Sequence, residues 1–330
     1  MATTTSGQIS VTPVRIHTTA TLEALQDAIG KDLYRGKPGS RGWGSVKDGT
    51  DPLIGRVTRE RPSGGRPEPV FDPDPYPKQL RARLYWDERD KRLEQVIGMQ
   101  GDSTAVSLLR AADVTFAPSS QDGELVGLLG ERNDGRLRAQ VLPAVEDLVR
   151  SVDKSATLQR DDNDLSFGDD DFFRWVLYRA THDPELNDDL EILWVRSMAN
   201  QDVSFRATSM TRGVELDRPE LLALLAGALN KFGPAKIIVS SESLSLRVSL
   251  EVTSSGAFSI YRGDTEYDYD LNDEPLSDDE EGLKLLQDVA FEILPELKRL
   301  HNADSDWRDT NRDAFRQEAR HLLQGVLDAL

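Results

Sequence analysis

The chain contains no cysteine among its 330 residues. This absence excludes disulfide bonds, cysteine nucleophiles and metal sites built on thiolate ligands. It is typical of proteins from reducing compartments, so we expect a cytoplasmic protein. The start of the sequence has neither the basic nor the apolar segment of a signal peptide. It also contains no run of about 18 apolar residues, and we therefore expect no membrane-spanning helix and no membrane partner.

Recognisable catalytic motifs are absent as well. The chain has four histidines, but no HExxH zinc motif, no GxSxG nucleophile motif and no GxxxxGK[ST] phosphate loop. His182 precedes Asp183, a pair that suits a general base. The alternative is that His182 interacts with the carboxyl end of its own helix. We therefore expect no cofactor and no metal, and we favour a function without catalysis.

Negative charge is in excess, with 58 Asp and Glu residues against 40 Lys and Arg residues and a formal net charge of −18. Nucleic acids and anionic membranes are also negative, so binding of either by the surface as a whole is disfavoured. The excess leaves room for a basic partner or for a locally basic patch. Arginine outnumbers lysine, and alanine, glycine and aspartate are abundant, which is typical of GC-rich bacterial coding.

Residues 31–66 form a basic, glycine-rich segment that differs from the rest of the chain. They include nine basic and four acidic residues, a net charge of +5. Cations suit a phosphate backbone, an interleaved aromatic ring suits base stacking, and glycines let backbone amides approach phosphate. The alternatives are a loop against the acidic remainder of the protein or a disordered tether. The candidate nucleic-acid-binding residues are Lys31, Arg35, Lys37, Arg41, Trp43, Arg56, Arg59 and Arg61.

Two acidic stretches are candidate cation sites. In residues 264–270 four carboxylates alternate with other residues, so in a strand they would share one face and two or three could hold Mg²⁺ or Ca²⁺. The aspartates in residues 161–171 suggest a calcium loop, but Ser166 stands where an EF-hand requires glycine. Like charges at this density are more typical of solvated loops, linkers and helix caps. We therefore favour no metal site in either stretch.

The clearest local pattern predicts a hairpin in residues 244–262. Apolar and polar residues alternate up to Val252, Ser254-Ser255-Gly256 supplies a turn, and the alternation resumes at Phe258. Thr21 predicts the start of one helix, and Ser277 with Glu280 forms a capping box for another. The predicted helices cover residues 21–30, 143–152, 172–181, 217–232, 283–300 and 307–330.

Turn signals place several further elements. Asn133-Asp134-Gly135 lies between two apolar runs and predicts a hairpin turn. Residues 87–90 are expected to form a turn between two strands, and residues 102–112 a short helix. Gly233-Pro234 is expected to end the helix that Asp217 caps.

These elements predict an α+β fold in which an antiparallel sheet is packed by C-terminal helices. A smaller mixed β-containing region and a Gly/Pro-rich basic N-terminal segment precede it. The predicted parts are an N-terminal helix with the basic extended segment (1–79), a small mixed α/β region (80–155), an acidic linker (156–171) and an α+β domain (172–330).

Three hypotheses for function follow. The first is a non-enzymatic binding or assembly component of a bacterial cytoplasmic complex, such as a multi-gene phage-defence system, with a protein partner or as a homo-oligomer. It rests on the missing catalytic motifs, the charge asymmetry and the amphipathic C-terminal helices. The second is nucleic-acid binding through residues 31–66 with the adjacent Arg81 and Arg83. The third is a metal-dependent phosphate or phosphodiester enzyme that uses an acidic cluster.

Overall fold

The computed structural model of the chain contains two compact units. Unit 1 consists of Met1–Gln8 and Leu165–Leu330, and unit 2 consists of Ile9–Asp164. The chain passes from one unit to the other twice, between Gln8 and Ile9 and between Asp164 and Leu165. Residues 9–79 and 80–155, which differ in composition, lie in the same unit. The structure describes residues 2–3, 7–37, 39–47, 57–58, 63–89, 95, 107–201, 207–227, 230–268 and 276–329.

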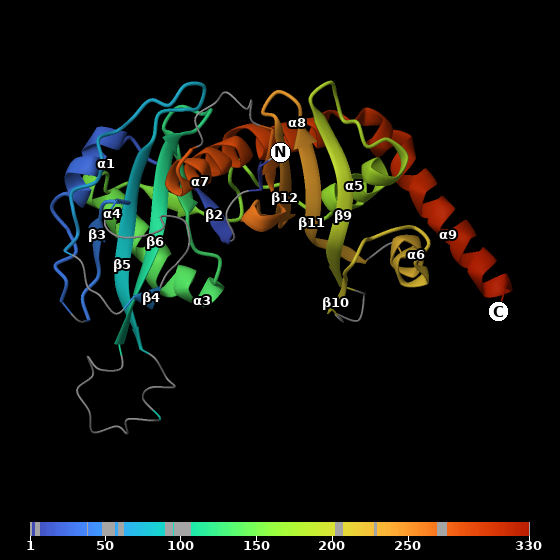
Figure 1. The fold of residues 1–330 in the computed structure, drawn as a ribbon, viewed down its shortest axis with the longest axis horizontal. Helices are drawn as coiled ribbons and strands as arrows, with labels where there is room; N and C mark the ends of the chain where they lie inside the picture. The colour runs from blue at the N-terminus through green and yellow to red at the C-terminus, as the bar shows by residue number, and fades with distance from the viewer. Residues whose placement is uncertain are drawn as a thin grey trace. The chain divides into compact units, whose positions relative to one another are not determined.

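Unit 2 combines an antiparallel sheet with helices (Figure 1). Its elements are β2 (Gln8–His17), α1 (Leu22–Ile29), β3 (Gly42–Gly44), β4 (Val57–Thr58), β5 (Leu80–Arg89), β6 (Ser107–Pro118), β7 (Glu124–Leu129), α3 (Asp134–Arg136), a π-helical stretch (Leu137–Val141), α4 (Leu142–Val152) and β8 (Thr157–Gln159). The strand order is β2-β7-β6-β5-β3, with β4 paired to β6 and β8 paired to β2. Apolar side chains of α1 and α4 join those of the strands in one core.

Helix α1 forms where the sequence predicts it. The Thr21 hydroxyl accepts a hydrogen bond from the backbone amide of Ala24 at 3.2 Å, which satisfies one of the free amides of the first turn. Leu22, Leu25 and Ile29 form the buried stripe. The local pattern of caps and apolar spacing is therefore sufficient for this element.

Unit 1, like unit 2, combines antiparallel strands with helices. Its elements are β1 (Ala2–Thr3), α5 (Asp171–His182), β9 (Leu190–Gln201), β10 (Ala207–Met210), α6 (Pro219–Ala226), β11 (Lys231–Ser241), β12 (Leu246–Val252), β13 (Phe258–Tyr261), a 3-10 turn (Arg262–Asp264), β14 (Glu266–Tyr267), α7 (Asp278–Gln287), a π-helical stretch (Asp288–Ile293), α8 (Leu294–Ala303), a second π-helical stretch (Trp307–Asn311) and α9 (Arg312–Asp328). The strand order is β10-β9-β11-β12-β13, and β14 pairs with both β12 and β1.

The sheet in unit 1 has one face covered by helices. In Figure 1, α5 and α8 lie behind β9, β11 and β12, and no helix of the described residues lies in front of these strands. Phe172, Phe173, Val176 and Leu177 of α5 are buried. The opposite face of these strands carries polar side chains, among them Glu191, Ser240 and Arg247.

The predicted hairpin and the predicted capping box are both confirmed. Strands β12 and β13 pair antiparallel, with Leu250 opposite Ile260. The Ser277 hydroxyl accepts a hydrogen bond from the Glu280 amide, and the Glu280 carboxylate accepts one from the Ser277 amide at 2.9 Å. Together with the antiparallel strands and the packed C-terminal helices, these elements confirm the predicted α+β class. Within the described residues, no helix is long and apolar enough to cross a membrane.

Three predictions in unit 2 are wrong. Strand β5 continues through residues 87–89, because its pairing with β6 extends to Arg89 opposite Ser107. Residues 107–112, predicted as part of a helix, therefore belong to β6. The Asn133-Asp134-Gly135 sequence begins a helix instead of a hairpin, because the Asn133 side chain accepts a hydrogen bond from the Arg136 amide at 3.0 Å.

One helix in unit 1 is shorter than predicted. Helix α6 ends at Ala226, and Arg218 is its N-terminal cap, with no side-chain cap from Asp217. Strand β11 begins at Lys231 and includes Gly233-Pro234. This strand hydrogen-bonds to β9 on one side and β12 on the other, and that pairing outweighs the local helical pattern.

Candidate functional site

A cavity of about 730 Å³ lies at one end of the sheet in unit 1. Its walls come from the segment after α5, the start of β9, the end of β11, the turn into β12, and β14 with the residue that follows it. We call this cavity the acidic hollow. Its lining residues are Asp183, Glu185, Asn187, Asp188, Asp189, Leu190, Glu191, Ser240, Ser241, Glu242, Ser245, Leu246, Arg247, Glu266 and Asp268.

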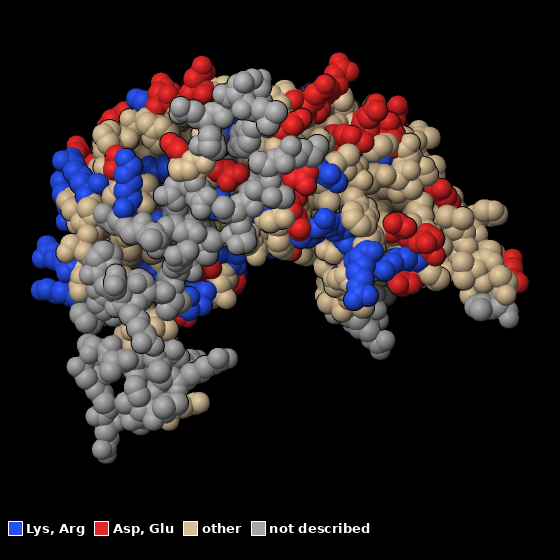
Figure 2. Space-filling model, viewed as in Figure 1, with Lys and Arg blue, Asp and Glu red and all other residues tan. Residues whose placement is uncertain are grey.

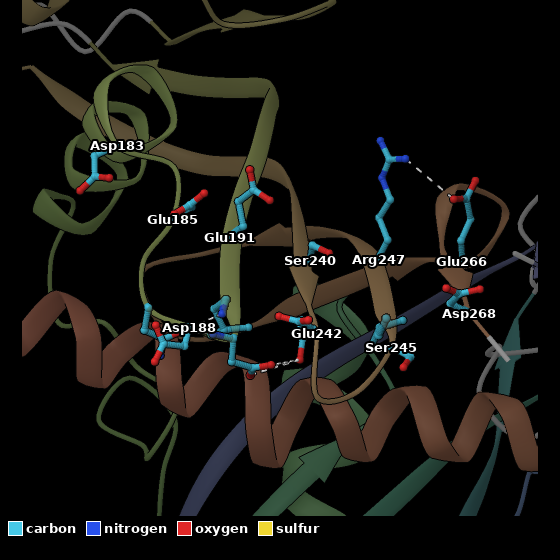
Figure 3. Close-up of a pocket in the computed structure, with 15 residues that line it drawn as sticks. Asp183, Glu185, Asp188, Glu191, Ser240, Glu242, Ser245, Arg247, Glu266 and Asp268 are labelled. Carbon is cyan, nitrogen blue, oxygen red and sulfur yellow. Dashed lines mark hydrogen bonds and ion pairs between the residues drawn. The ribbon is translucent and has the colours of Figure 1, made fainter. Parts of the chain in front are cut away.

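Negative charge dominates the acidic hollow. Eight of the lining side chains are carboxylates, whereas Arg247 is the single cation among them. Figure 3 shows that the labelled carboxylates come from several separate elements. A concave surface lined by one sign of charge concentrates the electrostatic field and attracts ions of the opposite sign.

Strand register places part of this lining in one row. Ser240 on β11 lies opposite Glu191 on β9 and opposite Arg247 on β12. Arg247 in turn lies opposite Glu266 on β14. Paired residues on adjacent strands point to the same face of a sheet, so the four side chains line one edge of the hollow (Figure 3). Arg247 and Glu266 form an ion pair of 3.8 Å.

Asp189 has a structural role in the acidic hollow. Its carboxylate accepts hydrogen bonds from the Ser243 amide at 2.7 Å and from the Ser241 hydroxyl at 3.1 Å. Burial raises the pKa of Asp189, but these hydrogen bonds lower it by more, so the pKa lies below its ordinary value. Asp189 therefore holds the turn between β11 and β12 in place.

Three other carboxylates of the hollow have no such structural role. Among the described residues, none provides a cation within 4.0 Å of the side chains of Asp188, Glu191 or Glu242, and these carboxylates accept no hydrogen bond there. Asp188 and Glu242 are exposed, and Glu191 is half-buried. Their charges are therefore available to a ligand.

An adjoining cavity of about 360 Å³ shares Asp189 with the hollow. Glu292 and Glu296 of the α7–α8 region line it. Burial raises the pKa of Glu292, and the charges of Asp288, Asp189 and Glu296 raise it further. The negative potential therefore extends beyond the acidic hollow itself.

The residues of the predicted basic site lie in different environments. Lys31, Arg35 and Lys37 are exposed in unit 2, and among the described residues they have no acidic partner within 4.0 Å. Figure 2 shows Lys and Arg side chains gathered at the left edge of the view, beside α1 and β3. Arg41 forms an ion pair of 2.7 Å with Asp147. Arg56, Arg59 and Arg61 lie outside the described residues.

The aromatic ring of this segment is part of the core. Trp43 lies in β3 and is 2% exposed, so no face of its indole is open to a base. Lys31, Arg41 and Trp43 do line one cavity of about 600 Å³, but Asp27 and Asp147 line it too. The segment therefore offers cations without the stacking surface that single-stranded nucleic acids favour.

The glycines of the segment allow close backbone packing. A Cβ atom on Gly42 would lie 2.7 Å from the Tyr34 backbone, and one on Gly64 would lie 2.3 Å from the Trp43 carbonyl oxygen. The Gly64 amide donates to the Tyr34 carbonyl at 2.7 Å, and the Tyr34 amide donates to the Trp43 carbonyl at 2.7 Å. Gly42 and Gly64 bring three backbone segments together, a role that accounts for these two glycines without a phosphate.

Where the structure describes them, the acidic stretches identified in the sequence do not form a metal site. Asp264 lies in a 3-10 turn and pairs with Arg196 at 2.7 Å and Lys236 at 2.9 Å. Asp164 pairs with Arg15 at 3.2 Å. Asp270 lies outside the described residues. Within the part of the chain that is described, no group of three or more His, Asp or Glu side chains could hold a metal ion.

His182 contacts another helix at the end of α5. Its Nε2 lies 3.0 Å from a carboxylate oxygen of Glu318 in α9, and its ring packs against Tyr178 and Phe315. This arrangement ties two helices of unit 1 together.

Sequence reasoning did not identify the acidic hollow. Five of its eight carboxylates lie within residues 183–191, and the pairing of β9, β11, β12 and β14 brings Glu242, Glu266 and Asp268 to the same cavity. No protein-family model matches the chain, and no curated protein matches it either. The geometry of the hollow is therefore the basis for a functional proposal.

Proposed function

We propose that this protein is a non-enzymatic binding component that holds a lysine- and arginine-rich segment of a partner protein in the acidic hollow. The observation that supports this proposal is the convergence of eight carboxylates on one cavity, of which Asp188, Glu191 and Glu242 have no cation partner among the described residues. A basic segment would supply the missing cations.

The size and the lining of the hollow favour this class of ligand. About 730 Å³ is within the usual range of ligand cavities, but small organic ligands are usually bound by mainly apolar walls. Charged walls instead give specificity and fast association with a partner of opposite charge. Their effect weakens as salt screens the charges.

Nucleic-acid binding is the alternative function. It is supported by the free cations Lys31, Arg35 and Lys37, and it is weakened by the burial of Trp43. Phosphate contacts alone would give binding without sequence preference and with strong salt dependence. The net charge of −18 also opposes such binding at long range.

A binding experiment tests the proposal with a labelled peptide of alternating lysine and serine, followed by fluorescence anisotropy. The test variant neutralises the free carboxylates of the hollow with Asp188→Asn, Glu191→Gln and Glu242→Gln. We expect it to bind the peptide at least about tenfold more weakly than the natural chain at low salt, and with a shallower salt dependence.

The matched control removes the same amount of charge elsewhere, with Asp122→Asn, Asp161→Asn and Asp309→Asn. All three of these carboxylates are exposed. The control is expected to bind the peptide within about twofold of the natural chain. Equal losses in both variants would show that the peptide responds to net charge alone, and that outcome would overturn the proposal.

A further inference from the structure

Strand β9 contains a bulge beside the acidic hollow. Its register against β11 advances irregularly, because Ile238 lies opposite Trp194 whereas the next residue, Val239, lies opposite Ile192. Leu193 is the extra residue. A bulge of this kind disrupts the strict alternation of side chains and re-aims them. As a result Leu193 and Trp194, although adjacent, are both exposed, at 37% and 42%.

This pair is unusual among the exposed apolar side chains. Among the described residues, six large hydrophobic side chains are exposed, and Leu193 and Trp194 are the two that are adjacent in sequence. The chain has five tryptophans. The other four are at most 2% exposed, so Trp194 is the one with a solvent-accessible indole. Exposed tryptophan is enriched at the energetic centres of protein interfaces.

The pair is continuous with the acidic hollow. Glu191, which lines the hollow, lies opposite Ser240, and Trp194 lies opposite Ile238. Ser240 and Ile238 are successive positions on the same face of β11, so the two rows are about 7 Å apart. The exposed apolar pair therefore lies one row of side chains away from the edge of the acidic hollow.

Two cations near Trp194 share one carboxylate. The Arg196 guanidinium lies over the Trp194 ring at 5.7 Å and pairs with Asp264 at 2.7 Å. Lys236 pairs with the same carboxylate at 2.9 Å. The carboxylates of the hollow, one row of side chains away, disfavour an acidic peptide or a nucleic acid at this surface. Two copies of the hollow would also repel each other, which disfavours self-association through this face.

We infer that Leu193 and Trp194 bind an apolar side chain of the same basic partner segment. The inference rests on the proposed function and specifies its ligand: an extended protein segment in which an apolar residue stands two positions from a lysine or arginine. The reason is spacing, since alternate side chains of an extended chain are about 7 Å apart, the same separation as the two rows of the site.

Two peptides test the inference against the full chain. Both are alternating lysine–serine peptides in which one central lysine is replaced, by leucine in one and by serine in the other. They have the same charge, and the leucine stands two positions from a lysine. We expect the leucine peptide to bind about tenfold more tightly, and a variant with Leu193→Ser and Trp194→Ala to lose this preference while keeping its affinity for the serine peptide.

Tryptophan fluorescence supplies an independent readout. Because Trp194 alone is exposed, acrylamide quenching of the natural chain reports mainly on this residue. The leucine peptide is expected to reduce quenching, and the serine peptide is expected to leave it unchanged. Leu327→Ser is the control, since this exposed leucine of α9 lies outside the hollow and should not alter the peptide preference.

The outcomes separate the inference from the proposed function. Equal, salt-dependent binding of both peptides by the natural chain would overturn the inference and leave the proposed function standing. So would a leucine preference that survives in the double variant. Failure of both peptides to bind would overturn the proposed function. Peptide-independent, concentration-dependent oligomers that protect Trp194 from acrylamide would show that a second copy occupies the face, and would also overturn the inference.

Discussion

The acidic hollow of unit 1 and the basic segment of unit 2 are both concentrations of one sign of charge, but they differ in what the charges contact. In the hollow, Asp188, Glu191 and Glu242 have no cation partner among the described residues. In the basic segment, Arg41 is paired and Trp43 is buried. The fold thus uses part of the basic segment, whereas three carboxylates of the hollow remain available to a ligand.

The surroundings of the basic segment strengthen the contrast. Arg83, which the sequence groups with that segment, is buried on β5 and donates to Asp113 on β6 at 2.6 Å. Both side chains are 5% exposed. A buried pair of this kind is part of the folded structure, and its charge does not reach the surface.

The largest expected effect comes from breaking that pair. Asp113→Ala removes the carboxylate that pairs with the buried Arg83 guanidinium, and we expect a loss of about 3–5 kcal/mol in the free energy of unfolding. Urea denaturation followed by circular dichroism measures this loss. Asp188→Ala in the hollow is the comparison, with an expected change below about 0.5 kcal/mol. Similar losses for the two variants would remove the distinction between buried and available charge.

The next effect concerns the glycines of the basic segment. Gly64→Ala places a Cβ atom 2.3 Å from the Trp43 carbonyl oxygen, and we expect a destabilisation of about 2–3 kcal/mol by the same denaturation assay. Gly263→Ala is the control, because no atom lies within 4 Å of its added Cβ. A neutral Gly64→Ala variant would mean that the segment tolerates side chains and that its glycines are not there for backbone packing.

A smaller effect separates structural from free carboxylates within the hollow. Asp189→Asn removes a charged acceptor of hydrogen bonds from the β11–β12 turn, and we expect a loss of about 1 kcal/mol at neutral pH. The pKa of Asp189 is lowered in the folded protein, so its stabilisation is present above the unfolded pKa of about 3.9 and is lost as the pH falls through the folded pKa.

The natural chain and the Asp189→Asn variant should therefore converge in stability under acidic conditions. Denaturation curves at a series of pH values test this. A difference that stays constant as the pH falls would show that the Asp189 charge does not stabilise the turn.

The smallest effect is expected from the free cations of the basic segment. Changing Lys31, Arg35 and Lys37 to Gln should alter the free energy of unfolding by less than about 0.5 kcal/mol, because all three are exposed. It should also leave binding of the lysine–serine peptide within about twofold. Weaker peptide binding in this variant would contradict the assignment of the peptide to the hollow.

Sequence patterns predict those parts of the fold that depend on neighbours in the chain. The β12–β13 hairpin and the Ser277–Glu280 capping box need only local alternation and local hydrogen bonds. The end of α6 was not predictable, because Lys231 and Gly233 enter a strand that is stabilised by β9 and β12 on either side. The Asn133 sequence serves a hairpin turn and a helix cap equally well, and only the surrounding packing decides between them.

The candidate site was less predictable than the fold. Glu191 and Glu266 are more than seventy positions apart, and their shared row exists only through the pairing of β9, β11, β12 and β14. The exposure of Trp194 depends on a bulge, a feature that alternation of residue types does not reveal. The basic segment, in contrast, can be recognised from its amino-acid composition, although some of its residues have structural roles in the folded protein.

The most direct test compares two ligands on the same chain in the same buffer over a range of salt concentrations. One is the labelled lysine–serine peptide, and the other is a labelled single-stranded oligothymidylate of similar length. We predict that the peptide binds at low salt and is released as salt increases, while the oligonucleotide does not bind. Binding of the oligonucleotide without binding of the peptide would contradict the claim that the acidic hollow, and not the basic segment, is the functional site of this protein.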